Sequence, residues 1–230
     1  MSEQKEFRQQ RFTRPPGATE ILLVRHGESR AASPDRPFPL VDGQGDPELH
    51  PNGEAQAQRV GERLRVQPIG AVYVSKLRRT AQTAAPLCAH LGLTARVDPD
   101  LHEVHLGEWE GGLFRMKAAA QDPAYVRMQA EERWDVIPGG EAPDALTLRL
   151  GRALARIAAA HPDELVAAFV HGGVIAHCLH MATGSRPFAF TGAENGSISH
   201  LVVHDGVIRV RRFNDTTHLE DLDAGSGQMT

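Results

Sequence analysis

Two histidines stand at the ends of two similar apolar runs that lie far apart in the sequence. The run 21–25 leads into His26, and the run 165–170 leads into His171. Both runs are short, rich in aliphatic residues and followed by glycine, which is typical of buried strands. Parallel strands carry ligands beyond their carboxyl ends, so we expect both imidazoles at one edge of a sheet. Two facing imidazoles there indicate a site for an anion.

The neighbours of the first histidine favour that interpretation. Arg25 precedes His26, and Gly27 follows it. Arginine presents a planar fork of donors that matches phosphate oxygens, and glycine lets the backbone approach a ligand closely. A histidine that stands alone after a strand is more often a hydrogen-bonded core residue. The combination of arginine, histidine and glycine at a strand end weakens that simpler interpretation.

A second basic segment follows a second predicted strand, 70–74. Ser75 is expected to cap the next helix, which places Arg78 in its first turn. Backbone N–H groups and the helix dipole favour an anion at that end. A cation there does not stabilise the helix, so we expect Arg78 to face the anion and Arg79 to be a solvated surface residue. The predicted apolar stripe of this helix is Ala81, Ala84, Leu87, Cys88 and Leu91.

Three carboxylates lie in the segment 101–111, namely Glu103, Glu108 and Glu110. One of them is a candidate general acid, because a positioned carboxyl can protonate a leaving group. The residues alone leave open which of the three has that role. Surface carboxylates are common, and Glu108 and Glu110 taken alone are more typical of a solvated loop.

Closely spaced histidines make a metallohydrolase an alternative. His102 and His105 form one pair, and His177 and His180 form another. The i, i+3 spacing of the second pair can place both side chains on one helix face. No carboxylate-rich ligand set accompanies either pair, so helix packing is the simpler interpretation and we expect no metal.

Strand and helix patterns alternate along most of the chain. The helical patterns begin at residue 51, cover 113–133 with a break at 122–123, and recur near 146–157 and 174–182. Such alternation predicts an α/β fold, in which a mostly parallel central sheet is covered on both faces in a three-layer αβα sandwich.

The end of the chain predicts a different kind of strand pairing. The runs 197–203 and 207–212 flank Asp205 and Gly206, a pair that indicates a type I′ hairpin. We therefore expect an antiparallel C-terminal edge on the sheet. We expect one domain over residues 18–219, a disordered tail at 1–17 and a flexible tail at 220–230.

Composition narrows the classes of partner. The chain has 230 residues, a formal net charge of −4 and a hydrophobic fraction of 41%, which does not favour binding of nucleic acid through overall charge. The first 17 residues are polar, with no apolar segment typical of a signal peptide. No apolar stretch approaches the roughly 20 residues that a membrane span needs. We expect a cytoplasmic protein that binds neither nucleic acid nor membrane.

Taken together, four motifs resemble those of the histidine phosphatase superfamily, the group that contains the cofactor-dependent phosphoglycerate mutases and many phosphatases. They occur in the family's order, and the match extends from about residue 20 to residue 219 with the ending 214–219. A single Arg-His-Gly is a weak signal, but four ordered motifs are a strong one. The motifs are Arg25-His26-Gly27-Glu28-Ser29, the segment 75–84, the segment 101–111 and Val170-His171-Gly172-Gly173.

The resemblance implies a role for each matching residue. His26 corresponds to the nucleophile that accepts the phosphoryl group, and Glu103 to the general acid, because it stands four residues before Gly107 as the family pattern requires. Phosphate-binding positions are implied for Arg25, Arg78 and His171. Further substrate contacts are expected from Ser29, Gly172 and, at the edge of the pocket, Asn195.

The resemblance also implies the class of reaction. It points to a metal-independent phosphomonoesterase that hydrolyses a small phosphorylated metabolite through phosphohistidine, with no cofactor. A homodimer is a further expectation. The substrate itself is left open, although the loop 30–50 and the segment 114–143 are expected to form a lid that sets specificity. Cations that could meet a second acidic group there are Arg36, Arg115, Lys117, Arg127 and Arg133.

Two departures from the family pattern bear on the reaction. Ala32 stands where mutase-like members have an asparagine, so one phosphate contact is missing or supplied elsewhere. Gly173 and Val174 follow the His171-Gly172 pair of the fourth motif, where the mutases tend to carry Asn-Ser. Both departures favour hydrolysis, with a phosphoglycerate or sugar-phosphate mutase as the alternative. A binding domain without catalysis is less favoured, because every catalytic position is intact.

Overall fold

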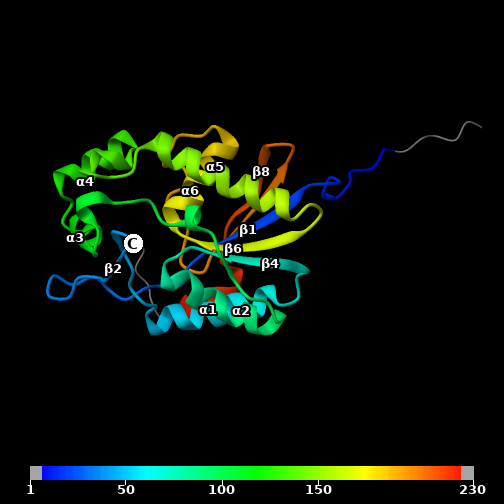
Figure 1. Ribbon diagram of the computed structural model, residues 1–230, viewed down its shortest axis with the longest axis horizontal. Coiled ribbons are helices and arrows are strands. Elements are labelled where there is room, and N and C mark those ends of the chain that lie inside the picture. Colours follow the sequence, from blue (N-terminus) through cyan, green and yellow to red (C-terminus); the bar gives the residue numbers. More distant parts are fainter. Residues whose placement is uncertain (1–6, 224–230) are drawn as a thin grey trace, which may run out of the picture.

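A six-stranded sheet forms the centre of the computed structural model, which describes residues 7–223 (Figure 1). The strand order is β5-β4-β6-β1-β7-β8. The first four of these strands are mutually parallel, and β7 and β8 pair antiparallel at the edge. The predicted sheet is therefore confirmed. Its strands are β1 (Thr19–Arg25), β4 (Ile69–Val74), β5 (Arg96–Val97), β6 (Leu165–Val170), β7 (Ile198–His204) and β8 (Val207–Asp215).

The register of the two histidine strands brings their ends together. β1 and β6 are neighbours, and Arg25 pairs with Val170 at their last position. Every residue of β6 is buried, because helices cover both faces of the sheet and leave no solvent side for polar residues. His26 and His171, which follow these two paired residues, therefore stand next to each other at the same edge of the sheet.

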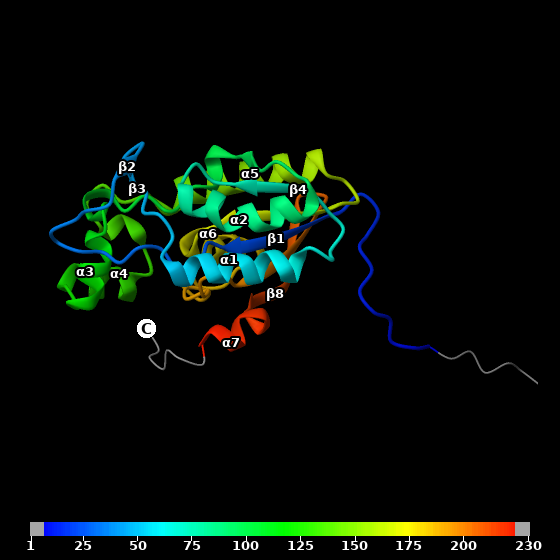
Figure 2. The same ribbon diagram turned by 90° about the horizontal axis from the view of Figure 1, so that it is seen from below.

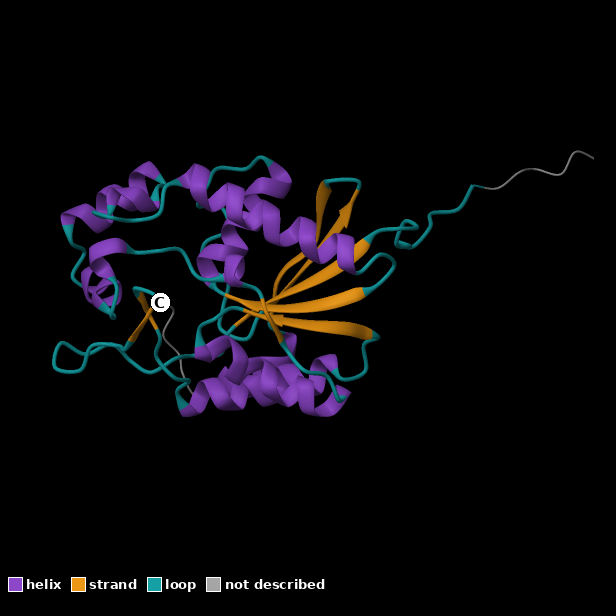
Figure 3. Cartoon of the chain, in the orientation of Figure 1, coloured by secondary structure: helices purple, strands orange, loops and turns teal. Residues whose placement is uncertain are grey.

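Helices cover both faces of the sheet (Figures 1 and 3). The lower layer in Figure 1 consists of α1 (Pro51–Leu64) and α2 (Arg78–Leu91), and the upper layer of α5 (Pro143–Ala160) and α6 (Gly172–Thr183). A separate apolar core fills the space on each face. The three-layer αβα sandwich is the predicted architecture.

A lid lies beyond the carboxyl end of β1, and we use this name for β2, β3 and the segment 106–137, which contains α3 and α4 (Figure 2). α3 (Leu113–Ala119) and α4 (Pro123–Glu131) confirm the predicted break, since Asp122 accepts a hydrogen bond from the Ala124 amide and caps α4. A small core of its own stabilises the lid around Trp109 and Met128. The remaining short elements are β2 (Leu40–Val41), β3 (Gln44–Gly45), η1 (Pro99–Leu101), η2 (Gly107–Trp109), η3 (Trp134–Val136), η4 (Thr217–Leu219) and α7 (Glu220–Asp223).

The start of α2 differs from the prediction. Leu77, not Ser75, occupies the N-cap position, and no side chain caps the helix there. The Ser75 hydroxyl instead contacts the ring of His171 and the Leu77 amide. The C-terminal hairpin agrees with the prediction, because Asp205 and Gly206 both have positive φ, 49° and 73°, as a type I′ turn requires.

Parts of the two proposed tails, residues 1–6 and 224–230, lie outside the described residues. Among the residues that are described, the Gly17 amide donates a hydrogen bond to Asp163, and the Arg211 guanidinium lies over the ring of Phe12. None of the helices within 7–223 combines the length and the apolar character that a membrane crossing requires.

Candidate active site

The two predicted histidines meet at the edge of the sheet. The ring centroids of His26 and His171 are 5.2 Å apart, and the ring planes make an angle of 62°. Both side chains are buried, at 5% and 0% exposure. The prediction that distant segments bring two imidazoles together is confirmed.

Hydrogen bonds give the His26 ring a definite tautomer. Its Nδ1 lies 2.7 Å from the carbonyl oxygen of Gly27, and a carbonyl can only accept, so Nδ1 carries the proton. Nε2 accepts a hydrogen bond from Arg79 Nε at 3.1 Å. Burial, and after it the charges of Arg79 and Arg25, hold the pKa of His26 well below its usual 6.5. The ring is thus neutral near pH 7, with the lone pair of a nucleophile at Nε2.

Arg79, not Arg78, lies at the site, which corrects the prediction for this pair. Arg79 is 7% exposed and spans from His26 to the carbonyl oxygen of Gly45. Arg78 turns outward, with a side chain that is 46% exposed and an ion pair of 2.9 Å to Asp46. Asp46 also accepts the Arg78 amide, so this carboxylate fixes Arg78 on the outer face of α2.

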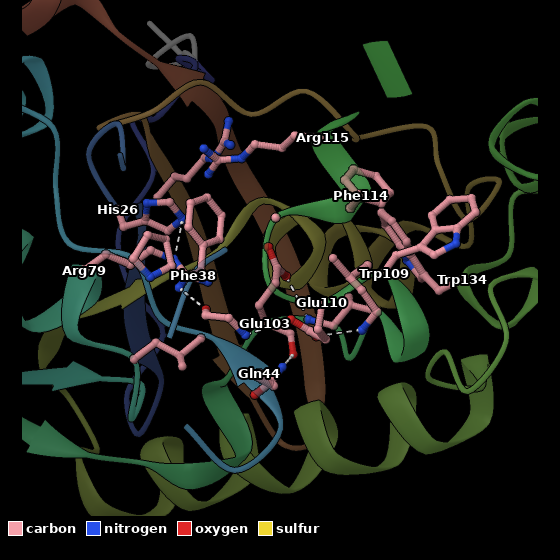
Figure 4. Close-up of a pocket in the computed structure, with 17 residues that line it drawn as sticks. His26, Phe38, Gln44, Arg79, Glu103, Trp109, Glu110, Phe114, Arg115 and Trp134 are labelled. Atoms are coloured by element: carbon pink, nitrogen blue, oxygen red, sulfur yellow. Dashed lines mark hydrogen bonds between the residues drawn. The ribbon is translucent and has the colours of Figure 1, made fainter. Parts of the chain in front are cut away.

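Glu103 is the carboxyl group that reaches the middle of the cavity (Figure 4). Its Oε1 accepts the Val104 amide at 2.9 Å, and its Oε2 accepts the Gly173 amide at 3.4 Å. Burial raises the pKa of Glu103, although the hydrogen bond from the Val104 amide and the charge of Arg79 oppose the rise. Burial therefore shifts this carboxyl toward its protonated form before any anion binds.

The other two glutamates of the segment differ from Glu103 and from each other. Glu108 is exposed. Glu110 also lines the cavity, but its two carboxylate oxygens accept the backbone amides of Leu106 and Gly45. Glu110 therefore ties the lid strand β3 to the loop that carries Glu103.

The remaining predicted residues surround the site at different depths. Arg25 lines the cavity and donates to the carbonyl oxygen of Ala193. Asn195 donates to the carbonyl oxygen of His26 at 2.8 Å, so it holds the backbone of that residue. Gly172 begins α6 beside Arg25, where an added Cβ would lie 3.4 Å from Arg25 Nε. His171 lies behind His26, with Nε2 bonded to Ser75 and Nδ1 buried without a partner.

A third arginine approaches the cavity from the lid. Arg115 of α3 donates to Ser29 Oγ at 2.7 Å and to the carbonyl oxygen of Arg30 at 3.0 Å. Ser29 is therefore occupied in holding Arg115. Ala32 lies close by, since a Cβ added at Gly112, which lines the cavity, would stand 3.1 Å from the Ala32 Cβ.

The cavity has a volume of about 270 Å³, and basic side chains surround the end at which His26 lies. Arg25 and Arg79 are buried there, and burial lowers the pKa of Arg79 to about 10, which leaves it charged at neutral pH. Such an end suits a dianion such as a phosphoryl group.

The aromatic residues that line the cavity come from three separate segments, and the sequence analysis did not single them out. They are Phe38, Trp109, Phe114 and Trp134.

The histidine pairs that suggested a metal have protein partners. His177 Nε2 lies 2.7 Å from Thr147 Oγ1, and His180 Nδ1 lies 2.6 Å from the carbonyl oxygen of Ser185. Within residues 7–223, no three histidine, cysteine, aspartate or glutamate side chains are grouped as a metal site.

Comparison with known proteins gives a consistent family. The model of the histidine phosphatase superfamily (branch 1) matches residues 21–216. Phosphoglycerate mutase-like protein 4 of Arabidopsis thaliana is 36% identical over 218 residues, which cover 90% of this chain and 91% of that protein. The metal-independent phosphoserine phosphatase of the same plant is 32% identical, with coverage of 89% and 84%.

A solved structure agrees with these sequence matches. Mycobacterial glucosyl-3-phosphoglycerate phosphatase in complex with VO3 superimposes with a TM-score of 0.73 and 29% identity. The match covers 86% of this chain and 99% of that one. The likeness therefore extends over most of both chains.

Proposed function

Because this chain belongs to the histidine phosphatase superfamily, we propose that it is a metal-independent phosphomonoesterase that acts on a small phosphorylated metabolite. Relatives named as phosphoserine and glucosyl-3-phosphoglycerate phosphatases support a phosphatase. One observation carries the proposal. His26 presents Nε2 to a cavity in which a guanidinium group already contacts that atom, while Nδ1–H is held by a carbonyl.

The first half of the reaction transfers the phosphoryl group to the enzyme. Arg25 and Arg79 bind the phosphoryl oxygens, and the Arg79 N–H moves from Nε2 to one of them. The Nε2 lone pair attacks phosphorus, so the N–P bond forms as the ester P–O bond breaks. Glu103 gives its proton to the leaving alcohol oxygen. This assignment agrees with the raised pKa of that carboxyl.

The second half returns the enzyme to its starting state. The Glu103 carboxylate takes a proton from water, and the water oxygen attacks phosphorus. The N–P bond breaks and its electron pair returns to Nε2, which releases inorganic phosphate. Phosphoryl transfer depends chiefly on positioning and charge stabilisation, and the arginines supply both here. Asn195 and the Gly27 carbonyl keep the ring oriented through both halves.

A mutase of the same family is the second candidate, and the name of one relative favours it. A mutase would share the first half-reaction and then return the phosphoryl group to a sugar or glycerate hydroxyl. Incubation with 3-phosphoglycerate and a bisphosphate primer separates the two reactions. We expect free phosphate to form faster than 2-phosphoglycerate.

The decisive experiment compares the wild type with His26→Ala. We expect phosphate release from a phosphomonoester to fall by at least about 1,000-fold, because the covalent route is lost. Acid-labile labelling of the wild type by a ³²P-labelled ester, absent in His26→Ala, would identify the intermediate.

His90→Ala is the matched control, since His90 pairs with Glu62 at the surface of α2, away from the cavity. We expect it to retain wild-type activity. Full phosphatase activity in His26→Ala would rule the proposal out.

A further inference from the structure

The cavity has two chemically different ends (Figure 4). His26 and Arg79 lie on one side of the view, and the rings of Trp109, Phe114 and Trp134 lie together on the other. Glu103 lies between these two groups. A phosphomonoester that fills this cavity would therefore meet the cations and the single ring of Phe38 at one end, and the group of three rings at the other.

The three rings form a continuous apolar wall. The Phe114 ring is 6.2 Å from the Trp109 ring and 6.1 Å from the Trp134 ring, measured between centroids. These distances are typical of aromatic pairs that hold one another in place. Trp109 belongs to the buried lid core, but Phe114 and Trp134 are only half-buried and line the cavity. The wall is thus fixed from behind and open toward the site.

The direction of the proposed reaction points the leaving group at this wall. In phosphoryl transfer the attacking and leaving atoms lie roughly in line across phosphorus. The alcohol oxygen must therefore face away from His26 and toward the proton of Glu103. The rest of the alcohol continues beyond Glu103, where the aromatic side chains stand.

From this geometry we infer the substrate class: a small phosphomonoester whose alcohol part carries an apolar ring or a comparable apolar body. The inference rests on the proposed function for its orientation. A hydroxylated or zwitterionic body would place polar groups against the rings at a cost in desolvation. The cavity of about 270 Å³ accommodates a body of roughly the size of one ring beside the phosphoryl group.

Binding can be measured without any reaction by using phosphonates, whose C–P bond the enzyme does not hydrolyse. Trp109 and Trp134 are the two tryptophans of the chain, and both line the cavity, so intrinsic fluorescence reports directly on the wall. We expect benzylphosphonate to bind at least about 10-fold more tightly than methylphosphonate, because it buries one ring. We expect 2-amino-4-phosphonobutyrate, with its zwitterionic body, to gain nothing over methylphosphonate.

Two variants distinguish the loss of a ring that contacts the ligand from a general loss of stability in the lid. Phe114→Ala should abolish the preference for benzylphosphonate and leave the dissociation constant of methylphosphonate within about 3-fold. Phe188→Ala is the matched control, because Phe188 packs 4.8 Å from Trp134 within the lid core but does not line the cavity. It should keep the preference. Equal loss in both variants would overturn the inference.

Steady-state hydrolysis of two phosphate esters gives a second test. Benzyl phosphate and phosphoserine are both primary alkyl esters, so their leaving oxygens are comparable. We expect kcat/KM to be at least about 10-fold higher for benzyl phosphate. Equal or faster hydrolysis of phosphoserine would overturn the substrate class and leave the proposed function intact. Hydrolysis of neither ester, with benzylphosphonate still preferred, would overturn the proposed function and support the aromatic wall as a binding site.

Discussion

Burial acts on the ionisable residues of the site in the direction that the proposed chemistry needs. A buried imidazole loses its proton more readily, and a buried carboxyl keeps its proton. The pKa of His26 is lowered and that of Glu103 is raised, and burial is the largest cause of both. The pocket therefore holds His26 neutral and shifts Glu103 toward its protonated form before substrate arrives.

The two adjacent arginines give a sharp test at the residue scale. We expect Arg79→Ala to lower kcat/KM by about 100-fold to 1,000-fold, because it removes a charged donor from the site of developing negative charge. Arg78→Ala should change kcat/KM by less than about 3-fold, since the half-exposed Arg78 side chain does not line the cavity and pairs with the buried Asp46 instead. Steady-state kinetics on one ester compares the two variants. The opposite ranking would contradict the geometry.

The shifted pKa values predict a pH dependence of defined sign. His26 must be unprotonated, so its lowered pKa confines the acid loss of activity to low pH. Glu103 must be protonated, so kcat/KM falls as pH rises through its raised pKa. We expect maximal kcat/KM on the acid side of neutrality.

The variant Glu103→Gln checks the origin of the alkaline loss. It should be slower by about 100-fold or more, and its kcat/KM should no longer carry the alkaline limb that Glu103 causes. The ionisation of the substrate is the same for both enzymes, so the difference between the two pH profiles belongs to Glu103. An unchanged alkaline limb in the variant would assign it to another group.

At the scale of elements, glycines allow the first turn of α1 to lie directly against the loop after β1. A Cβ added to Gly53 would stand 2.0 Å from the carbonyl oxygen of Glu28, and one added to Gly27 would stand 2.4 Å from the carbonyl oxygen of Gly53. Both neighbours are backbone atoms, which cannot rotate away. The position of His26 thus depends on a close contact between two backbone segments.

Two helical glycines provide a matched pair of substitutions. We expect Gly53→Ala to lower the free energy of unfolding by about 1–3 kcal/mol, because the methyl group forces the two segments apart. Gly151→Ala in α5 should be neutral or stabilise by up to about 1 kcal/mol, since its Cβ would meet Met181 only at ordinary contact distance, 3.7 Å. Urea unfolding measures both. Equal effects would show that the contact is not tight.

At the scale of the whole molecule, one buried arginine links the upper helix layer to the site. Arg149 of α5 forms an ion pair of 2.6 Å with Glu141. It also donates to the carbonyl oxygens of Asp100, His102 and Glu103. The loop that carries Glu103, the proposed acid, is therefore held in place by α5, a helix that follows the lid in the sequence.

Removal of that link has a large expected cost. Arg149→Leu should lower the free energy of unfolding by about 3–5 kcal/mol, because it leaves the Glu141 carboxylate buried without its partner. Arg152→Leu, one turn further along α5 and half-exposed, should cost less than about 1 kcal/mol. Thermal or urea unfolding compares the two, and similar losses would contradict a structural role for Arg149.

The expected homodimer stays a prediction. Light scattering tests it, since a dimer would have twice the 25.0 kDa mass of one chain.

Local patterns were sufficient to predict the sheet and the meeting of His26 and His171. Strand and helix periods are set by which side chains must be buried, and that information lies within a few residues of each position. Parallel strands then bring their carboxyl ends to one edge whatever the loops do. The family resemblance likewise follows from the order of the motifs in the sequence, without knowledge of the tertiary structure.

Which of the two arginines of α2 faces the site, and the aromatic wall, were decided only by tertiary structure. Arg78 was expected to face the anion from the first turn of α2, but Arg79 lies on the buried face instead. That face also contains Thr80, Thr83 and two residues of the predicted stripe, Ala84 and Leu87. Successive side chains on a helix point about 100° apart, so only one of the two arginines can face the cavity. Asp46, a residue of a distant loop, binds Arg78 on the outer face. The wall likewise joins Trp109 and Phe114 to Trp134, and such contacts exist only after the lid has folded.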